Sequence, residues 1–174
     1  RRPAAWSVAP VCGCLVFVCG GTHLFGVLVE GALSGLVLPE DRKRIVALLS
    51  NFEKRLRWDL SYRHLERDRA IRAGKSSRKA DRNFGLAQIK VLGHGLEVLS
   101  RARRLYPEDS QVFSSSMNQM LQELENLFLS GRYPGFDPVA LLQQKVSIEN
   151  PETWERAHGD LRHLIRGLRL AQES

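Results

Sequence analysis

Hydrophobic residues recur at helical spacing through most of the chain after Pro39. Over residues 39–72 they follow one another at intervals of three or four, while arginines occupy the opposite face; the apolar positions are Ile45, Leu48, Leu49, Phe52, Leu56 and Leu60. Pro39, Glu40 and Asp41 are typical of a helix start, because proline fits the first turn and acidic side chains stabilise the positive end of the helix dipole. The pattern predicts one long helix over this range.

A second helix is predicted over residues 84–106, before Pro107. Its apolar seam steps by three, four and three residues, as in a coiled coil, through Ile89, Leu92, Leu96 and Leu99. Gly93 and Gly95 interrupt this seam, and each costs about 1 kcal/mol relative to alanine within a helix. We therefore expect the backbone of another helix to approach closely at these two glycines.

Three further helices are predicted in the remainder of the chain. The first covers residues 110–130 and ends at Gly131. Asp137-Pro138 and Asn150-Pro151 each supply an N-cap and a first-turn proline, which predicts a short helix over 138–146 and a final helix from residue 151. The whole pattern predicts an all-α protein in which about five helices form an irregular bundle.

The first 38 residues follow a different pattern. Residues 7–39 contain no Lys, Arg or Asp and one Glu, and residues 11–29 form an uncharged run of 19, close to the roughly 20 that a transmembrane helix needs. We expect a single transmembrane helix, with the basic bulk of the chain on the cytoplasmic or matrix side. Two alternatives stay open, which are burial inside a soluble core or an assembly, and a signal peptide with a cleavage site near Ala32-Leu33-Ser34.

Composition divides the chain into three regions: an apolar anchor or buried segment at 1–38, a basic helical region at 39–106 and an acidic-leaning helical region at 107–174. Residues 42–104 contain 18 Lys and Arg against 6 Asp and Glu, whereas residues 105–174 contain 6 against 10. Positive charge is thus concentrated in the middle third. Within it, residues 73–82 are small, polar and basic, which predicts a linker.

A net charge of +7 and a pI near 9.8 favour an acidic partner, which is nucleic acid, anionic lipid or an acidic protein surface. The candidate residues for contact with nucleic acid or an anionic surface are Arg55, Arg57, Arg63, Arg67, Lys75, Arg78, Lys79 and Arg82. Trp58 and Tyr62 would add stacking on an unpaired base. The alternatives are that the arginines form a solvated helix face and that the two aromatic residues cover the edge of the core.

Catalytic motifs are absent from the sequence, which has no phosphate-binding loop, dinucleotide fingerprint, HExxH or GxSxG pattern. Arg57 with His64, and Arg156 with His163, have a spacing that some helical nucleases use. Pairs of this kind arise by chance in a chain with 20 arginines and 5 histidines. We therefore expect neither an enzyme nor a cofactor.

Cys12, Cys14, Cys19 and His23 lie within twelve residues and would supply the four ligands of a zinc ion. Their spacing matches no common zinc finger, and apolar surroundings disfavour the thiolate form that binds metal. We therefore interpret the cysteines as small buried thiols and predict no metal site.

Two functional hypotheses follow. The first is a non-catalytic helical accessory subunit of a larger multi-protein assembly, anchored in or against the mitochondrial inner membrane, or on its matrix side, through residues 11–38. An arginine-rich start at Arg1 fits removal of a transit peptide, and simple trimming of the chain explains it equally well. The second is a soluble RNA-binding or ribonucleoprotein-assembly protein, cytoplasmic or nuclear, that uses residues 42–104. The expected partners are protein subunits, membrane lipid or RNA, without a small-molecule substrate.

Overall fold

The computed structural model describes residues 22–143 and 151–173, in which every element of regular secondary structure is a helix. These residues contain six α-helices and two short 3-10 helices, in the order α2 (Thr22–Leu33), η2 (Pro39–Asp41), α3 (Arg42–Arg72), α4 (Ser77–Leu105), η3 (Pro107–Asp109), α5 (Ser110–Phe128), α6 (Pro138–Gln143) and α7 (Pro151–Gln172). The prediction of an all-α fold is confirmed.

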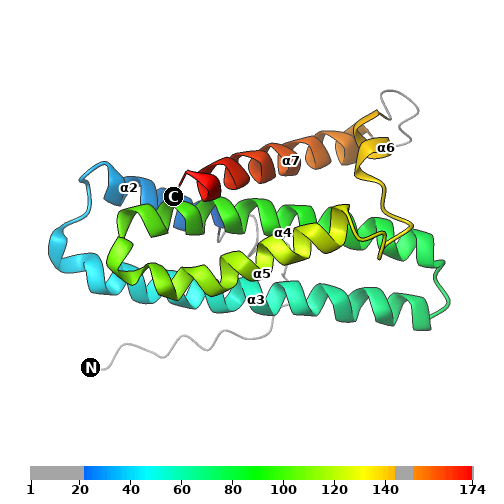
Figure 1. Cartoon of the computed structure of the whole chain (residues 1–174), viewed down its shortest axis with the longest axis horizontal. Coiled ribbons are helices and arrows are strands. Elements are labelled where there is room, and N and C mark those ends of the chain that lie inside the picture. Colours follow the sequence, from blue (N-terminus) through cyan, green and yellow to red (C-terminus); the bar gives the residue numbers. More distant parts are fainter. Residues whose placement is uncertain (1–21, 144–150, 174) are drawn as a thin grey trace, which may run out of the picture.

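Helix α4 lies at the centre of the bundle (Figure 1), where α3 and α5 pack along one side of it and α2 and α7 along the other. Sixteen of its 29 residues are buried. The predicted seam explains this position, because Ile89, Leu92, Leu96 and Leu99 are all buried. Burial on so many sides leaves little room for polar groups, so those that α4 carries inward need partners from neighbouring helices.

The apolar faces predicted for α3 and α5 meet α4 in one core. The buried members are Ile45, Leu49, Phe52, Leu56 and Leu60 from α3, and Phe113, Met117, Met120, Leu124 and Leu127 from α5. Leu48 and Leu121 lie at the edge of this core and are exposed. Helix α3 spans 31 residues, in agreement with the long helix that the sequence predicts.

Helices α4 and α7 approach closely at two glycines. A Cβ atom placed on Gly93 would lie 2.7 Å from the backbone nitrogen of Leu164, and one on Gly167 would lie 2.9 Å from the backbone nitrogen of Glu97. Real Cβ atoms essentially never approach backbone this closely, so only glycine allows this crossing. The expected approach of another helix at Gly93 is confirmed. At Gly95 the neighbour is instead the flexible end of the Met120 side chain.

The predicted linker at 73–82 differs from the structure. The connection between α3 and α4 comprises residues 73–76 only, and Ser77 begins α4. Gly74, with a φ of +81°, allows the turn after α3, and the Ser76 side chain accepts a hydrogen bond of 3.2 Å from the backbone of Lys79. This N-cap and the burial of Asp81 stabilise a helix where the composition alone suggested none.

None of the helices formed by the described residues is long and apolar enough to cross a membrane. Of the predicted transmembrane segment, residues 11–21 lie outside the described residues, and the remainder forms the 12-residue α2. That helix packs on α4 and α3 through buried Val29 and through Phe25, whose ring centroid is 4.6 Å from that of Phe52. Its carboxylate, Glu30, pairs with Arg101 of α4.

We predict that Gly93→Ala destabilises the protein by about 2 kcal/mol, because the overpacking cost at the α4–α7 crossing exceeds the gain in helix propensity of about 1 kcal/mol. Gly159→Ala is the matched control in α7, since its Cβ would meet nothing within 4 Å, and it should be neutral or stabilising. Urea unfolding followed by circular dichroism measures both changes. Equal stabilities of the two variants would contradict the close crossing.

Candidate functional site

The eight basic residues that the sequence suggests for anion contact fall into two groups. Four of them, all on α3, form ion pairs within the chain: Arg55 with Asp59 (3.3 Å), Arg57 with Glu53 (3.0 Å), Arg63 with Glu66 (3.0 Å) and Arg67 with Asp81 (2.7 Å). Because these guanidinium groups already have carboxylate partners, a polyanion would gain less from contacting them.

The other four basic residues, Lys75, Arg78, Lys79 and Arg82, are exposed and lie on the α3–α4 connection and the first turns of α4. None of them has an ion pair with another described residue. We call this group the basic end. All four lie within a stretch of eight residues, 75–82, so their charges act together on any bound anion.

Trp58 and Tyr62 contact each other rather than standing free. Their rings are stacked, with centroids 4.9 Å apart and planes 11° apart. The guanidinium carbon of Arg55 lies 4.3 Å from the Trp58 centroid. The Trp58 ring thus already has two partners in the chain, which favours the interpretation of the pair as a cover for the edge of the core.

Asp81 joins the elements that shape the basic end. Its carboxylate is 1% exposed and accepts hydrogen bonds from Nε of Arg67 on α3 (2.7 Å) and from the backbone N–H of Gly135 (3.2 Å). Burial disfavours the charged form of Arg67, but the hydrogen bond and charge of Asp81 outweigh it and raise the pKa of Arg67. One buried carboxylate therefore ties α3, α4 and the loop of residues 129–137 together.

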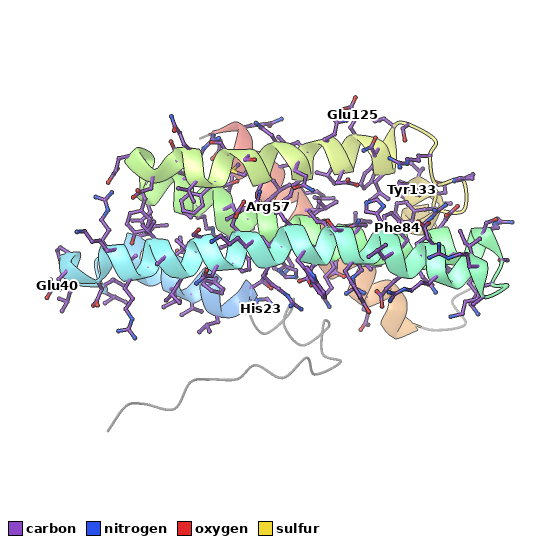
Figure 2. All side chains as sticks on the ribbon, turned by 90° about the horizontal axis from the view of Figure 1, so that it is seen from below. His23, Glu40, Arg57, Phe84, Glu125 and Tyr133 are labelled. Carbon is purple, nitrogen blue, oxygen red and sulfur yellow. The ribbon has the colours of Figure 1, made fainter. Side chains whose placement is uncertain are left out.

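The same loop is pressed against the start of α4. Phe84 and Tyr133 lie together near one end of the bundle (Figure 2), with ring centroids 4.7 Å apart. A Cβ on Gly135 would lie 2.5 Å from the backbone of Arg78, so glycine is required for this contact. The loop thereby forms one wall of a groove along α4.

Two grooves flank the first turns of α4. The larger, of about 440 Å³, lies between α4 and the loop and is lined by Arg78, Lys79 and Arg82. The smaller, of about 270 Å³, lies between α4 and α3 and is lined by Lys75 and Lys79 together with Arg63 and Arg67. Lys79 and Asn83 line both grooves. The basic end therefore presents a path for an extended anion on both flanks of one helix.

A second polar cluster, which the sequence analysis did not predict, lies between α2, α4 and α7. It contains His23, His94 and His163, one from each helix, with ring centroids 5.1 Å (His23 to His94), 6.0 Å (His23 to His163) and 4.0 Å (His94 to His163) apart. A groove of about 480 Å³ opens beside the three rings. The only sequence signal for it was the pair of glycines flanking His94, which indicates a helix crossing but not its chemistry.

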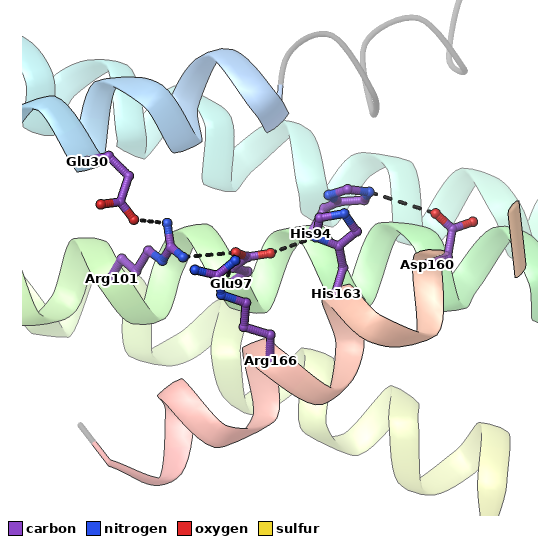
Figure 3. A network of polar contacts seen from close by, with 7 residues as sticks. All are labelled: Glu30, His94, Glu97, Arg101, Asp160, His163 and Arg166. Atoms are coloured by element: carbon purple, nitrogen blue, oxygen red, sulfur yellow. Dashed lines mark hydrogen bonds and ion pairs between the residues drawn. The ribbon is translucent and has the colours of Figure 1, made fainter. Parts of the chain in front are cut away.

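Glu97 contacts one of these histidines and two arginines beside them (Figure 3). Its carboxylate accepts from Nδ1 of His163 (2.8 Å) and pairs with Arg101 (3.0 Å) and Arg166 (3.3 Å), while Arg101 also pairs with Glu30. Asp160 lies 3.8 Å from Nε2 of His94. The cluster joins three helices through charge-assisted hydrogen bonds.

Within the described residues, no group of three or more His, Cys, Asp or Glu side chains is arranged to hold a metal ion. Cys12, Cys14 and Cys19, considered above as zinc ligands with His23, lie outside the described residues. Arg57 and His64, considered as a nuclease pair, contact different carboxylates: Arg57 pairs with Glu53, and His64 with Glu123 at 3.2 Å. The Arg156 side chain also lies outside the description.

The chain was compared with protein families, curated proteins and solved structures. No protein-family model, no curated protein and no solved structure matches the chain. Functional inference therefore depends on the geometry and charge of the residues described above.

We predict that Asp81→Ala destabilises the protein by about 3 kcal/mol, since it leaves the partly buried Arg67 without its main partner and the Gly135 N–H without an acceptor. Asp68→Ala is the matched control, because Asp68 also pairs with Arg67 at 3.0 Å but is exposed, and it should cost under about 1 kcal/mol. Urea unfolding measures both. Similar losses for the two variants would contradict the central role of Asp81.

We predict that His23 makes the fold sensitive to acid. His23 is exposed, but desolvation on the side that faces the bundle and the neighbouring His94 and His163 lower the pKa of His23 below 6.5, against the opposing charge of Glu97 and with a small contribution from Lys90. The neutral imidazole therefore stabilises the folded state fully above pH 6.5, and this contribution is lost as the pH falls through the lowered pKa.

The measurement is urea unfolding between about pH 7.5 and pH 5.5, with His23→Gln beside the wild type. The variant should lose less stability on acidification than the wild type. An identical pH dependence for both proteins would show that His23 contributes nothing to it.

Proposed function

We propose that this protein is a non-catalytic helical accessory subunit of a larger multi-protein assembly, which it joins through α2 and the segment that follows. The observation that carries this proposal is an apolar surface on residues 24–38. Five of its large side chains are between 47% and 81% exposed: Leu24, Val27, Leu33, Leu36 and Leu38. We call this set the α2 surface.

The α2 surface is separate from the side of α2 that packs on the bundle. Val29 is buried and Phe25 packs against the core. Leu24 and Val27 are neighbours on the exposed side of the helix. Gly26, between them, has nothing within 4 Å of its Cβ position, which leaves space for a partner to approach the helix backbone. Contiguous exposed apolar side chains are typical of interaction sites.

A mitochondrial membrane complex is the setting that we propose for this assembly. The exposed apolar side chains of α2 suit contact with a membrane surface or with a membrane-bound subunit.

We predict that Leu24→Asp with Val27→Asp releases the protein from its assembly without unfolding it, because both side chains are exposed and a buried carboxylate at an interface is strongly unfavourable. Sedimentation of mitochondrial detergent extracts that contain the tagged full chain measures the change. The wild type should migrate well above its own 19.7 kDa, and the variant as a free chain.

The matched control is Ile165→Asp, which changes an equally exposed apolar residue on α7, and it should leave the size of the complex unchanged. Co-migration of the double variant with the wild type, or sedimentation of the wild type as a free chain, would contradict the proposal. Alkaline carbonate extraction of mitochondrial membranes before the addition of detergent separates the two settings, since insertion of the apolar side chains into lipid resists the treatment and docking on a protein subunit does not.

A further inference from the structure

The basic end and the α2 surface lie at opposite ends of the bundle (Figure 1). Lys79, in the first turns of α4, and Arg101, which pairs with α2, are about 33 Å apart along the axis of this helix at the usual helical rise. A partner bound at the α2 surface therefore leaves the basic end open to a different partner.

No carboxylate among the described residues forms an ion pair with a cation of the basic end. Glu66, which lines the smaller groove, pairs with Arg63 at 3.0 Å. Asp81, the acidic residue of its own turn, is buried and is occupied by Arg67 and Gly135. Asp137, on the wall of the larger groove, accepts a hydrogen bond of 2.9 Å from the backbone N–H of Ala140 and so caps α6. The start of α4 adds the positive end of its dipole, so the local charge is strongly positive.

The spacing of these cations suits a chain of phosphates. Arg78 and Arg82 are four residues apart on α4, which is about 6 Å along the helix axis, and Lys75 lies in the α3–α4 connection just before the helix begins. Lys79 is shared by the two grooves, so the charges continue from one groove to the other. The two guanidinium groups can each bind a phosphate in a bidentate manner.

The larger groove is also lined by the apolar residues Leu86, Phe136 and Ala140, of which Phe136 is buried. A ligand that alternates anionic groups with flat apolar faces matches this combination. Acidic peptide segments also bind clusters of arginine. The cations here line two grooves on the two flanks of α4 and share Lys79, which favours a long polyanion with a regular repeat of charge over a single acidic cluster.

We infer that the basic end binds the phosphate backbone of single-stranded RNA, with Lys75, Arg78, Lys79 and Arg82 as the contacting residues. The other four arginines suggested by the sequence, which are paired with carboxylates of α3 and α4, contribute to the fold instead. Trp58 and Tyr62 are not needed for this binding. This inference is independent of the α2 surface.

The experiment is a fluorescence anisotropy titration of a short labelled oligouridylate with the full chain at several salt concentrations between about 50 and 200 mM. Each phosphate contact on a single strand contributes about −0.7 to the slope of log K against log salt. Four contacts should therefore give a slope of about −2.8 for the wild type.

The test variant is the triple substitution Arg78→Gln, Lys79→Gln and Arg82→Gln, which should reduce the slope to about −0.7 because one contact, Lys75, is left. The matched control is Arg57→Gln, which removes a positive charge from an exposed but ion-paired arginine and should leave the slope at the wild-type value. Circular dichroism of both variants verifies that the helical fold is retained.

Three results would overturn the inference. The first is the absence of oligouridylate binding by the wild type at the lowest salt concentration. The second is a reduction of the slope in Arg57→Gln of about one third of that in the triple variant, in proportion to the one and three charges removed, which would make binding a property of net charge alone. The third is equal competition by polyglutamate of the same charge, which would assign the site to acidic protein. None of these three results changes what sedimentation shows about the α2 surface. Failure of the RNA inference can therefore be told apart from failure of the proposed function.

Discussion

The close contact between the backbones of α4 and α7 at Gly93 and Gly167 is the constraint on which the rest of the structure depends. Because a Cβ at either position would lie within 3 Å of the facing backbone, only this pair of glycines lets the helices come so near. The approach brings His163 to 4.0 Å from the ring of His94 and to 2.8 Å from Glu97. Helix α2 then packs over the same stretch of α4, so three helices meet at one crossing.

Two carboxylates on α4, Glu97 and Asp81, pair with basic side chains of the bundle. Glu97 engages Arg101, His163 and Arg166 near one end of the bundle, and Asp81 engages Arg67 near the other. Each joins neighbouring helices at a place where an unpaired charge would be costly. Half of the suggested contact residues already pair with carboxylates of the chain, three within α3 and one, Arg67, between α3 and α4. The other half lie at the start of α4 and in the connection before it.

Parts of the candidate site could be predicted from the sequence. Lys75, Arg78, Lys79 and Arg82 stand out as a basic run, yet the same run reads as a linker, since polarity is shared by linkers and by exposed first turns of helices. The Ser76 cap and the burial of Asp81 decide between them, and the partner of Asp81 is 14 residues away in the chain. The histidine cluster joins residues about 70 positions apart, for which local spacing carries no signal.

Helical periodicity and glycine content are local properties, so the residue pattern alone predicts the all-helical class, the faces that form the core and a close helix approach at Gly93. The packing of the helices determines which arginines form internal ion pairs and which remain exposed. It also places the α2 surface and the basic end at opposite ends of the bundle, although α2 and the basic region are adjacent in sequence. The physical reason is the length of α3, whose 31 residues carry the chain from one end of the molecule to the other before α4 begins.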